Sequence, residues 1–196
     1  MFEFTNMDQI CAVVDIQGFY VKGTFYAREC AVVNDNVTTC QEFDPGIEWS
    51  DLSRKEISHV NYCKRFIHGL SFQPFVNLQN SPIPKSGELV KYLLAQYKLL
   101  ATNEKPLFGV KNDSLKNILL DAGILVCDLN DIKYRFPSIQ QLNKMHGRRW
   151  TCAFHLKQNF ENYRCAYRKC IQMWQYIKFA REPQIDVQKF EEIEIV

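Results

Sequence analysis

Two cysteines and one histidine near the C-terminal end of the chain have the spacing of a metal site. Cys152 and His155 form a Cys-x2-His pair, and nine residues separate His155 from Cys165. Thiolate and imidazole are preferred zinc ligands, and a structural zinc ion is held tetrahedrally by four protein ligands. The sequence therefore predicts three ligands of a structural zinc site and requires a fourth from elsewhere in the chain.

The helix that must position Cys165 is predicted by its apolar pattern. From Cys165 onward, apolar residues recur at steps of three and four, the period of a buried helix face: Ala166, Cys170, Met173, Trp174 and Ile177. Cys170, and His146 before the Cys-x2-His pair, remain alternative metal ligands. Each of these residue types, taken alone, is more often structural than metal-binding.

The same part of the chain is strongly basic. Residues 144–181 contain nine Lys and Arg residues and one acid, Glu161. Aromatic residues are placed among these charges, which suits phosphate contacts combined with base stacking. The residues predicted to contact RNA are Arg148, Arg149, Lys157, Arg164, Arg168 and Lys169, with Arg164 and Arg168 on one exposed stripe of the last helix. A solvated helix face is the plainer alternative.

The composition bounds the class of protein. The 196 residues, 46% hydrophobic and 13% aromatic, are enough for one domain with its own core, assigned to 1–182 and followed by an acidic tail at 183–196. The opening residues lack the basic region of a signal peptide, and no apolar run has the length of a membrane span. We therefore expect reduced cysteines, no membrane and a location in the cytoplasm or nucleus.

The element order predicts the fold class. Strands are expected at 10–14, 19–25 and 28–33, with a turn at Gly18 and a further strand at 39–43. Residues 47–84 read as irregular. A helix at 86–100, a strand at 107–110, a helix ending at Gly123, a strand at 124–129, a short helix at 138–145 and the last helix follow. This order predicts an α/β protein with a mixed sheet flanked by helices.

That order resembles the ribonuclease-H-like fold, in its DnaQ-type 3′–5′ exonuclease branch. Active members resemble one another in carboxylates that hold two magnesium ions. The first of their motifs reads Asp15-Ile16-Gln17 here, with an amide in place of one acid, and the acid position of the second motif is Lys116. The third motif falls at Tyr163/Arg168 or at Arg164/Lys169, so its acid is replaced by a base in either register.

These substitutions predict that the chain is not a two-metal exonuclease and holds no catalytic magnesium. A cationic side chain in place of a carboxylate changes the local charge by two units and occupies the space of the ion. Asp15 is expected to pair instead with Lys116 or with a basic residue of the last helix.

A degenerate exonuclease fold with a Glu-Cys-His-Cys zinc set resembles the Maelstrom domain family of the germline small-RNA pathway. Residues 26–33 (YARECAVV) are similar to the segment that carries the family's glutamate, so the resemblance implies Glu29 as the fourth zinc ligand beside Cys152, His155 and Cys165. Residues 107–113 are similar to the family's second-motif region. The resemblance covers roughly residues 10–180 through sparse motifs.

The resemblance implies a zinc-stabilised, RNA-binding pseudo-exonuclease that acts in piRNA-like silencing of transposons. It allows weak metal-independent cleavage of single-stranded RNA, protein partners from a silencing pathway, and location in perinuclear granules. The alternative is a protein–protein adaptor that kept a nuclease-derived fold without binding nucleic acid. A conventional exonuclease ranks last.

Overall fold

The computed structural model describes residues 7–74, 82–100, 106–131, 136–146 and 165–181. At its centre is a five-stranded mixed sheet with the order β3-β2-β1-β4-β5. The strands are Ile10–Val21 (β1), Thr24–Val33 (β2), Thr38–Glu42 (β3), Leu107–Val110 (β4) and Val126–Asp128 (β5). β2 is antiparallel to both of its neighbours, whereas β4 is parallel to β1 and to β5. The predicted α/β class with a mixed sheet is confirmed.

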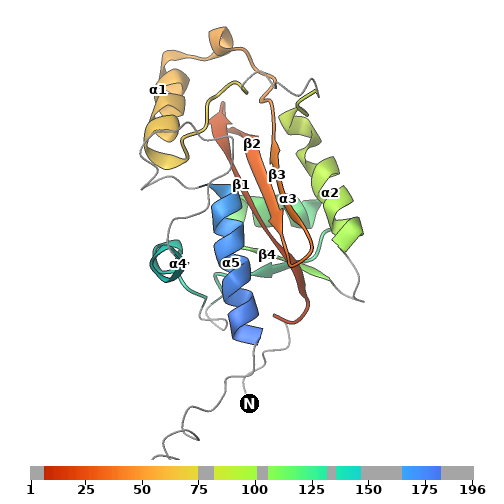
Figure 1. Ribbon diagram of the computed structural model, residues 1–196. Helices are drawn as coiled ribbons and strands as arrows, with labels where there is room; N and C mark the ends of the chain where they lie inside the picture. Colours follow the sequence, from red (N-terminus) through yellow and green to blue (C-terminus); the bar gives the residue numbers. More distant parts are fainter. Residues whose placement is uncertain (1–6, 75–81, 101–105, 132–135, 147–164, 182–196) are drawn as a thin grey trace, which may run out of the picture.

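Helices cover both faces of this sheet (Figure 1). They are Arg54–Tyr62 (α1), Leu89–Leu100 (α2), Asp113–Asp121 (α3), Ile139–His146 (α4) and Ala166–Arg181 (α5), with short helical turns at Trp49–Asp51 (η2), Cys63–Ile67 (η3) and Ser86–Glu88 (η4). α2 and α3 pack on one face, and α5 with α4 packs on the other. No helix among the described residues is long and apolar enough to cross a membrane.

The alternation of side chains along the strands divides the core into two layers. Val14 and Ile16 of β1 point into the layer under α2 and α3, and Val13 points into the layer under α5. Asp15 lies between Val14 and Ile16 in sequence, so it shares the α5 face. The apolar face predicted for α5 is confirmed, because all five of its residues are at most 6% exposed.

Two expectations for the first half of the chain are wrong. β1 does not end at Gly18 but continues to Val21 through a register shift between Gln17 and Gly18, and the chain turns at Lys22 and Gly23, both at positive φ. The strands expected at 19–25 and 28–33 are therefore parts of β1 and β2. The stretch 47–84, expected to be irregular, contains α1. Ser53 and Glu56 form a capping box at the start of this helix, a signal present in the sequence but not used in the prediction.

Gly18 is required where β1 and β2 shift register. A Cβ at this position would lie 2.1 Å from the backbone oxygen of Tyr26, a separation that demands movement of the strand itself. We expect Gly18→Ala to lower the free energy of unfolding by on the order of 3 kcal/mol, measured by urea denaturation. Gly87→Ala is the matched control, since nothing lies within 4 Å of its Cβ position. Equal stability of the two variants would contradict the tight fit at Gly18.

Candidate functional site

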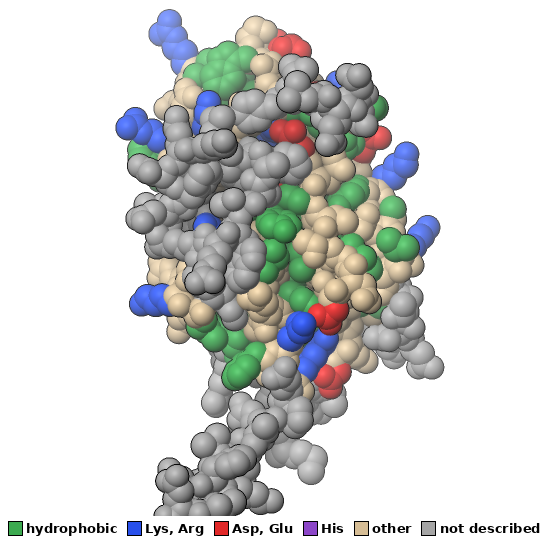
Figure 2. Space-filling model, viewed as in Figure 1, with side chains coloured by type: hydrophobic (Ala, Val, Ile, Leu, Met, Phe, Trp, Pro, Cys, Tyr) green, Lys and Arg blue, Asp and Glu red, His purple; other side chains and the backbone are tan. Residues whose placement is uncertain are grey.

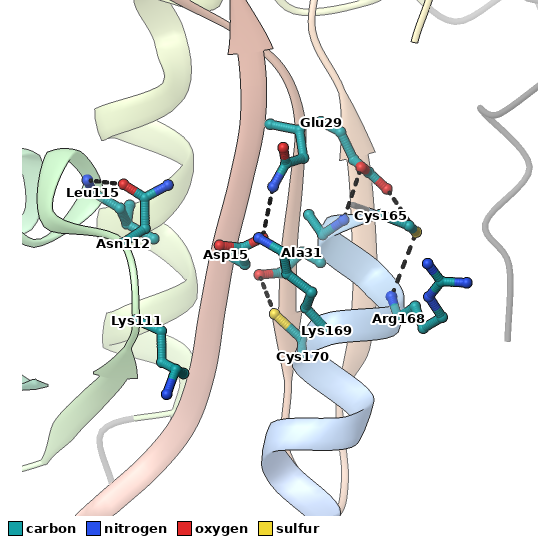
Figure 3. A network of polar contacts seen from close by, with 12 residues as sticks. Asp15, Glu29, Ala31, Lys111, Asn112, Leu115, Cys165, Arg168, Lys169 and Cys170 are labelled. Carbon is teal, nitrogen blue, oxygen red and sulfur yellow. Dashed lines mark hydrogen bonds and ion pairs between the residues drawn. The ribbon is translucent and has the colours of Figure 1, made fainter. Parts of the chain in front are cut away.

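Glu29 and Cys165 meet on the α5 face of the sheet. Glu29 is on β2 and is completely buried, and Cys165 immediately precedes α5 and is 4% exposed. The Sγ of Cys165 lies 3.4 Å from Oε1 of Glu29, although 136 residues separate the two positions in the chain. Figure 3 shows both side chains turned toward each other at the start of α5. Two of the four residues implied as zinc ligands are therefore in contact.

The first turn of α5 supplies backbone donors to both side chains. The N–H of Ala166 donates to Oε2 of Glu29 at 3.0 Å, and the N–H of Arg168 donates to the Sγ of Cys165 at 3.4 Å. Backbone N–H groups at a helix N-terminus are otherwise unpaired and stabilise negative charge. The arrangement therefore orients a carboxylate and a sulfur toward each other.

The separation of these two atoms fits a shared zinc ion. With Zn–O of about 2.1 Å and Zn–S of about 2.3 Å at a tetrahedral angle, two ligand atoms lie about 3.6 Å apart. The observed 3.4 Å between Oε1 and Sγ agrees with this spacing. The same distance also suits a hydrogen bond from the thiol, so the geometry is compatible with the metal-free state as well. Cys152 and His155, the other two implied ligands, lie outside the described residues.

Cys40 is a third side chain at this position, and it was not among the ligands that the sequence predicted. It lies on β3 opposite Ala31 of β2, and its Sγ is 3.4 Å from Oε1 of Glu29. Its place follows only from the pairing of β2 with β3, which no local motif reveals. Within the described ranges, however, the His, Cys, Asp and Glu side chains form no group of three or more arranged to hold a metal ion.

The alternative ligand Cys170 fits a metal poorly. Its Sγ lies 3.5 Å from the carbonyl oxygen of Ala31, to which the thiol donates. Complete burial raises the pKa of the Cys170 thiol well above its usual range, which opposes the thiolate that a metal requires. His146 is the last residue of α4, and its side chain is not among those described.

Beside the Glu29–Cys165 pair lies a buried carboxylate with a cationic partner. Asp15 is 2% exposed, and the Nζ of Lys169 lies 2.6 Å from its Oδ2. The side-chain amide of Gln17 donates to the same oxygen at 3.0 Å. Burial raises the pKa of Asp15, and the charge of Lys169 counteracts this rise. The prediction that Asp15 pairs with a basic residue of the last helix is confirmed, and the partner is Lys169.

Lys116 takes no part in this pair. Its Nζ lies 2.7 Å from Oδ2 of Asp128, at the end of β5. The hydrogen bond to Asp128 raises the pKa of Lys116. For Asp128 the largest single effect is burial, which raises its pKa, but the hydrogen bonds from Lys116 and Asn130 and the charge of Lys116 together outweigh burial and lower that pKa. Lys116 and Lys169, two cations at positions where the exonuclease resemblance expects acids, thus each pair with a carboxylate.

The exposure expected for part of the basic surface is wrong. Arg168 is only 4% exposed, and the side chain of Lys169 is 12% exposed and engaged with Asp15. Gln172, on the same side of α5 as Arg168, is completely buried and donates to Asn143 of α4. The exposed stripe predicted to contain Arg168 is therefore not formed, and neither Arg168 nor Lys169 presents a free cation to solvent. Arg148, Arg149, Lys157 and Arg164 lie outside the described residues.

The fold and the site together describe an α/β domain in which Cys165, just before α5, contacts Glu29 of β2, and Lys169 of α5 pairs with the buried Asp15 of β1. Comparisons with protein-family models, with curated proteins and with solved structures found no significant match.

Proposed function

We propose that this domain is a ribonuclease-H-like, DnaQ-type fold that has lost its two-metal exonuclease site. The sheet order β3-β2-β1-β4-β5, with β2 antiparallel to its neighbours, supports this proposal. So does the position of Asp15 under the last helix, where the fold would place its first acid. The ammonium of Lys169 occupies the place beside Asp15 that a magnesium ion would need.

We further propose that the domain is an RNA-binding module of the Maelstrom kind, stabilised by one zinc ion and acting in small-RNA silencing. The contact between Glu29 and Cys165 is the observation that carries this proposal, because the resemblance assigns these two distant residues to one metal site. Zinc would be held by Glu29, Cys152, His155 and Cys165. When bound, it would join β2 to the start of α5 and leave no open position for catalysis.

RNA binding is expected to depend on the basic segment before α5. Reversing Arg148 and Arg149 to Glu should make the log–log dependence of RNA affinity on salt shallower by at least about 1.4, since each lost phosphate contact removes about 0.7 from the slope for a single strand. Titration of a labelled single-stranded RNA at several chloride concentrations measures this slope.

The matched control is the double reversal of Lys91 and Lys98, two exposed lysines of α2, which lies on the face of the sheet opposite α5. It changes the net charge by the same amount, and the slope should be unaffected. If both double variants bind as the parent does, this segment is not an RNA surface. If the parent itself binds no RNA, the protein–protein adaptor replaces the RNA-binding module. Incubating the same RNA without added divalent cations tests for metal-independent cleavage.

A further inference from the structure

The outer face of α1 and η3 presents two aromatic rings to solvent. The inner face of this segment packs Val60 and Cys63 against Phe19 of β1. On the outer face, Tyr62 is 55% exposed and Phe66 is 53% exposed. An aromatic side chain left in water forgoes the favourable free energy of burying its apolar surface. Two neighbouring exposed rings therefore suggest a surface that a partner covers.

These rings form one continuous surface with a guanidinium group. The centroids of Tyr62 and Phe66 are 5.3 Å apart, with an interplanar angle of 44°. The guanidinium carbon of Arg65 lies 5.2 Å from the centroid of the Phe66 ring. η3 is a single π-helical turn that continues α1, and such turns occur frequently at functional sites. We call five of the exposed side chains of this segment the α1–η3 platform: Arg54, Lys55, Tyr62, Arg65 and Phe66.

The charge around the rings is positive. Residues 53–68 contain four Lys and Arg residues and one acid, Glu56. Both oxygens of Glu56 are already occupied, one by the N–H of Lys22 and the other by the N–H of Ser53. Lys22, whose side chain is exposed, thereby lies beside the start of α1. Lys and Arg side chains project from the upper left of Figure 2, where Figure 1 places α1.

We propose that the α1–η3 platform binds single-stranded RNA by stacking bases on Tyr62 and Phe66 while the surrounding cations contact phosphates. This inference rests on the proposed RNA-binding function and adds a second contact surface to it. Single-stranded RNA offers both anionic phosphates for the cations and flat bases for the rings. A purely apolar partner would cover the rings but leave the cations unpaired. Bases in a duplex are stacked on one another, so the platform requires single-stranded nucleic acid.

A pair of double variants isolates the stacking. Tyr62→Ala with Phe66→Ala removes both rings without changing charge, whereas Tyr62→Phe with Phe66→Tyr keeps both rings. The probe is a short labelled oligouridylate, and its affinity is measured by fluorescence anisotropy. We expect the alanine pair to weaken binding about tenfold or more and the ring-preserving pair to bind like the parent. Because these side chains are largely exposed, all variants should keep the parent's melting temperature.

The charges are tested separately with Arg54→Gln and Lys55→Gln, which should make the salt slope shallower by about 1.4. If the double alanine variant binds oligouridylate as the parent does, the proposed binding at the α1–η3 platform is wrong, while the proposed function is unaffected. A parent that binds no RNA overturns both. Loss of binding to phosphatidylserine vesicles in the alanine pair, with RNA binding unchanged, would make the platform a membrane surface and also overturn the proposal.

Discussion

Replacing Cys165 by serine is expected to release the zinc ion and to lower the melting temperature by on the order of 10 °C. The change removes the sulfur that lies 3.4 Å from Oε1 of Glu29 and leaves a weak oxygen ligand in its place. Because zinc would join β2 to α5, its loss should affect the whole domain rather than one loop. Elemental analysis of the purified protein and thermal unfolding with and without a chelator measure both effects.

Cys170→Ser is the matched control for this experiment. Cys170 lies on the same helix, is completely buried, and donates to a carbonyl oxygen that a serine hydroxyl can also reach. We expect this variant to keep one zinc ion per chain. If Cys165→Ser retains zinc and Cys170→Ser loses it, Cys170 rather than Cys165 is the ligand. If the parent protein holds no zinc, the proposed site is wrong. Glu29→Gln should behave like Cys165→Ser, since an amide is a poorer ligand than a carboxylate.

Replacing Lys169 by methionine is expected to lower the free energy of unfolding at pH 7 by about 3–5 kcal/mol. The substitution leaves the buried carboxylate of Asp15 with the amide of Gln17 but without its cationic partner. The pKa of Asp15 is already raised by burial, and loss of Lys169 should raise it further. The folded variant then binds a proton more tightly than the unfolded chain. Its stability should therefore increase as the pH falls through the folded-state pKa, as urea unfolding across a pH series would show.

Two further variants make this test specific. The double variant Asp15→Asn with Lys169→Met removes both charges and should recover most of the lost stability. Lys178, on the same helix as Lys169, pairs with Asp35 in the turn between β2 and β3. Both of these side chains are 53% exposed, so Lys178→Met should cost less than about 1 kcal/mol. A Lys169→Met protein no less stable than Lys178→Met would show that the Asp15–Lys169 contact contributes nothing.

Much of the fold follows from periodicity, and the failures have local causes. The buried face of α5 was predicted because its apolar residues recur at helical steps and nothing interrupts them. α1 was missed because its apolar residues are few and scattered among charges, although Ser53 and Glu56 marked its start. The path of β1 was misread because glycine usually ends a strand, whereas Gly18 allows the register to shift and the strand to continue.

The site was predictable only in part, because its members come together through tertiary packing. Spacing alone identified Cys165, but the link to Glu29 came from family resemblance, since no local pattern joins positions 136 residues apart. The chemistry of Asp15 required a cation, yet the choice of Lys169 over Arg168 depends on how α5 is rotated on the sheet. Cys40 was missed for the same reason, because the pairing of β2 with β3 alone brings it to Glu29.

α5 covers one face of β1 and β2, and this arrangement has a consequence for synthesis of the protein. The strands emerge first from the ribosome, and the helix that covers one of their faces is the last described element. At about 5–20 residues per second, that face waits roughly 7–30 s for its cover. During this interval Asp15 and Glu29 are accessible to water on an otherwise apolar nascent surface. Their negative charges discourage contact between neighbouring unfinished chains. When α5 packs on the sheet, Lys169 neutralises Asp15, and Glu29 accepts a hydrogen bond from the first turn of α5.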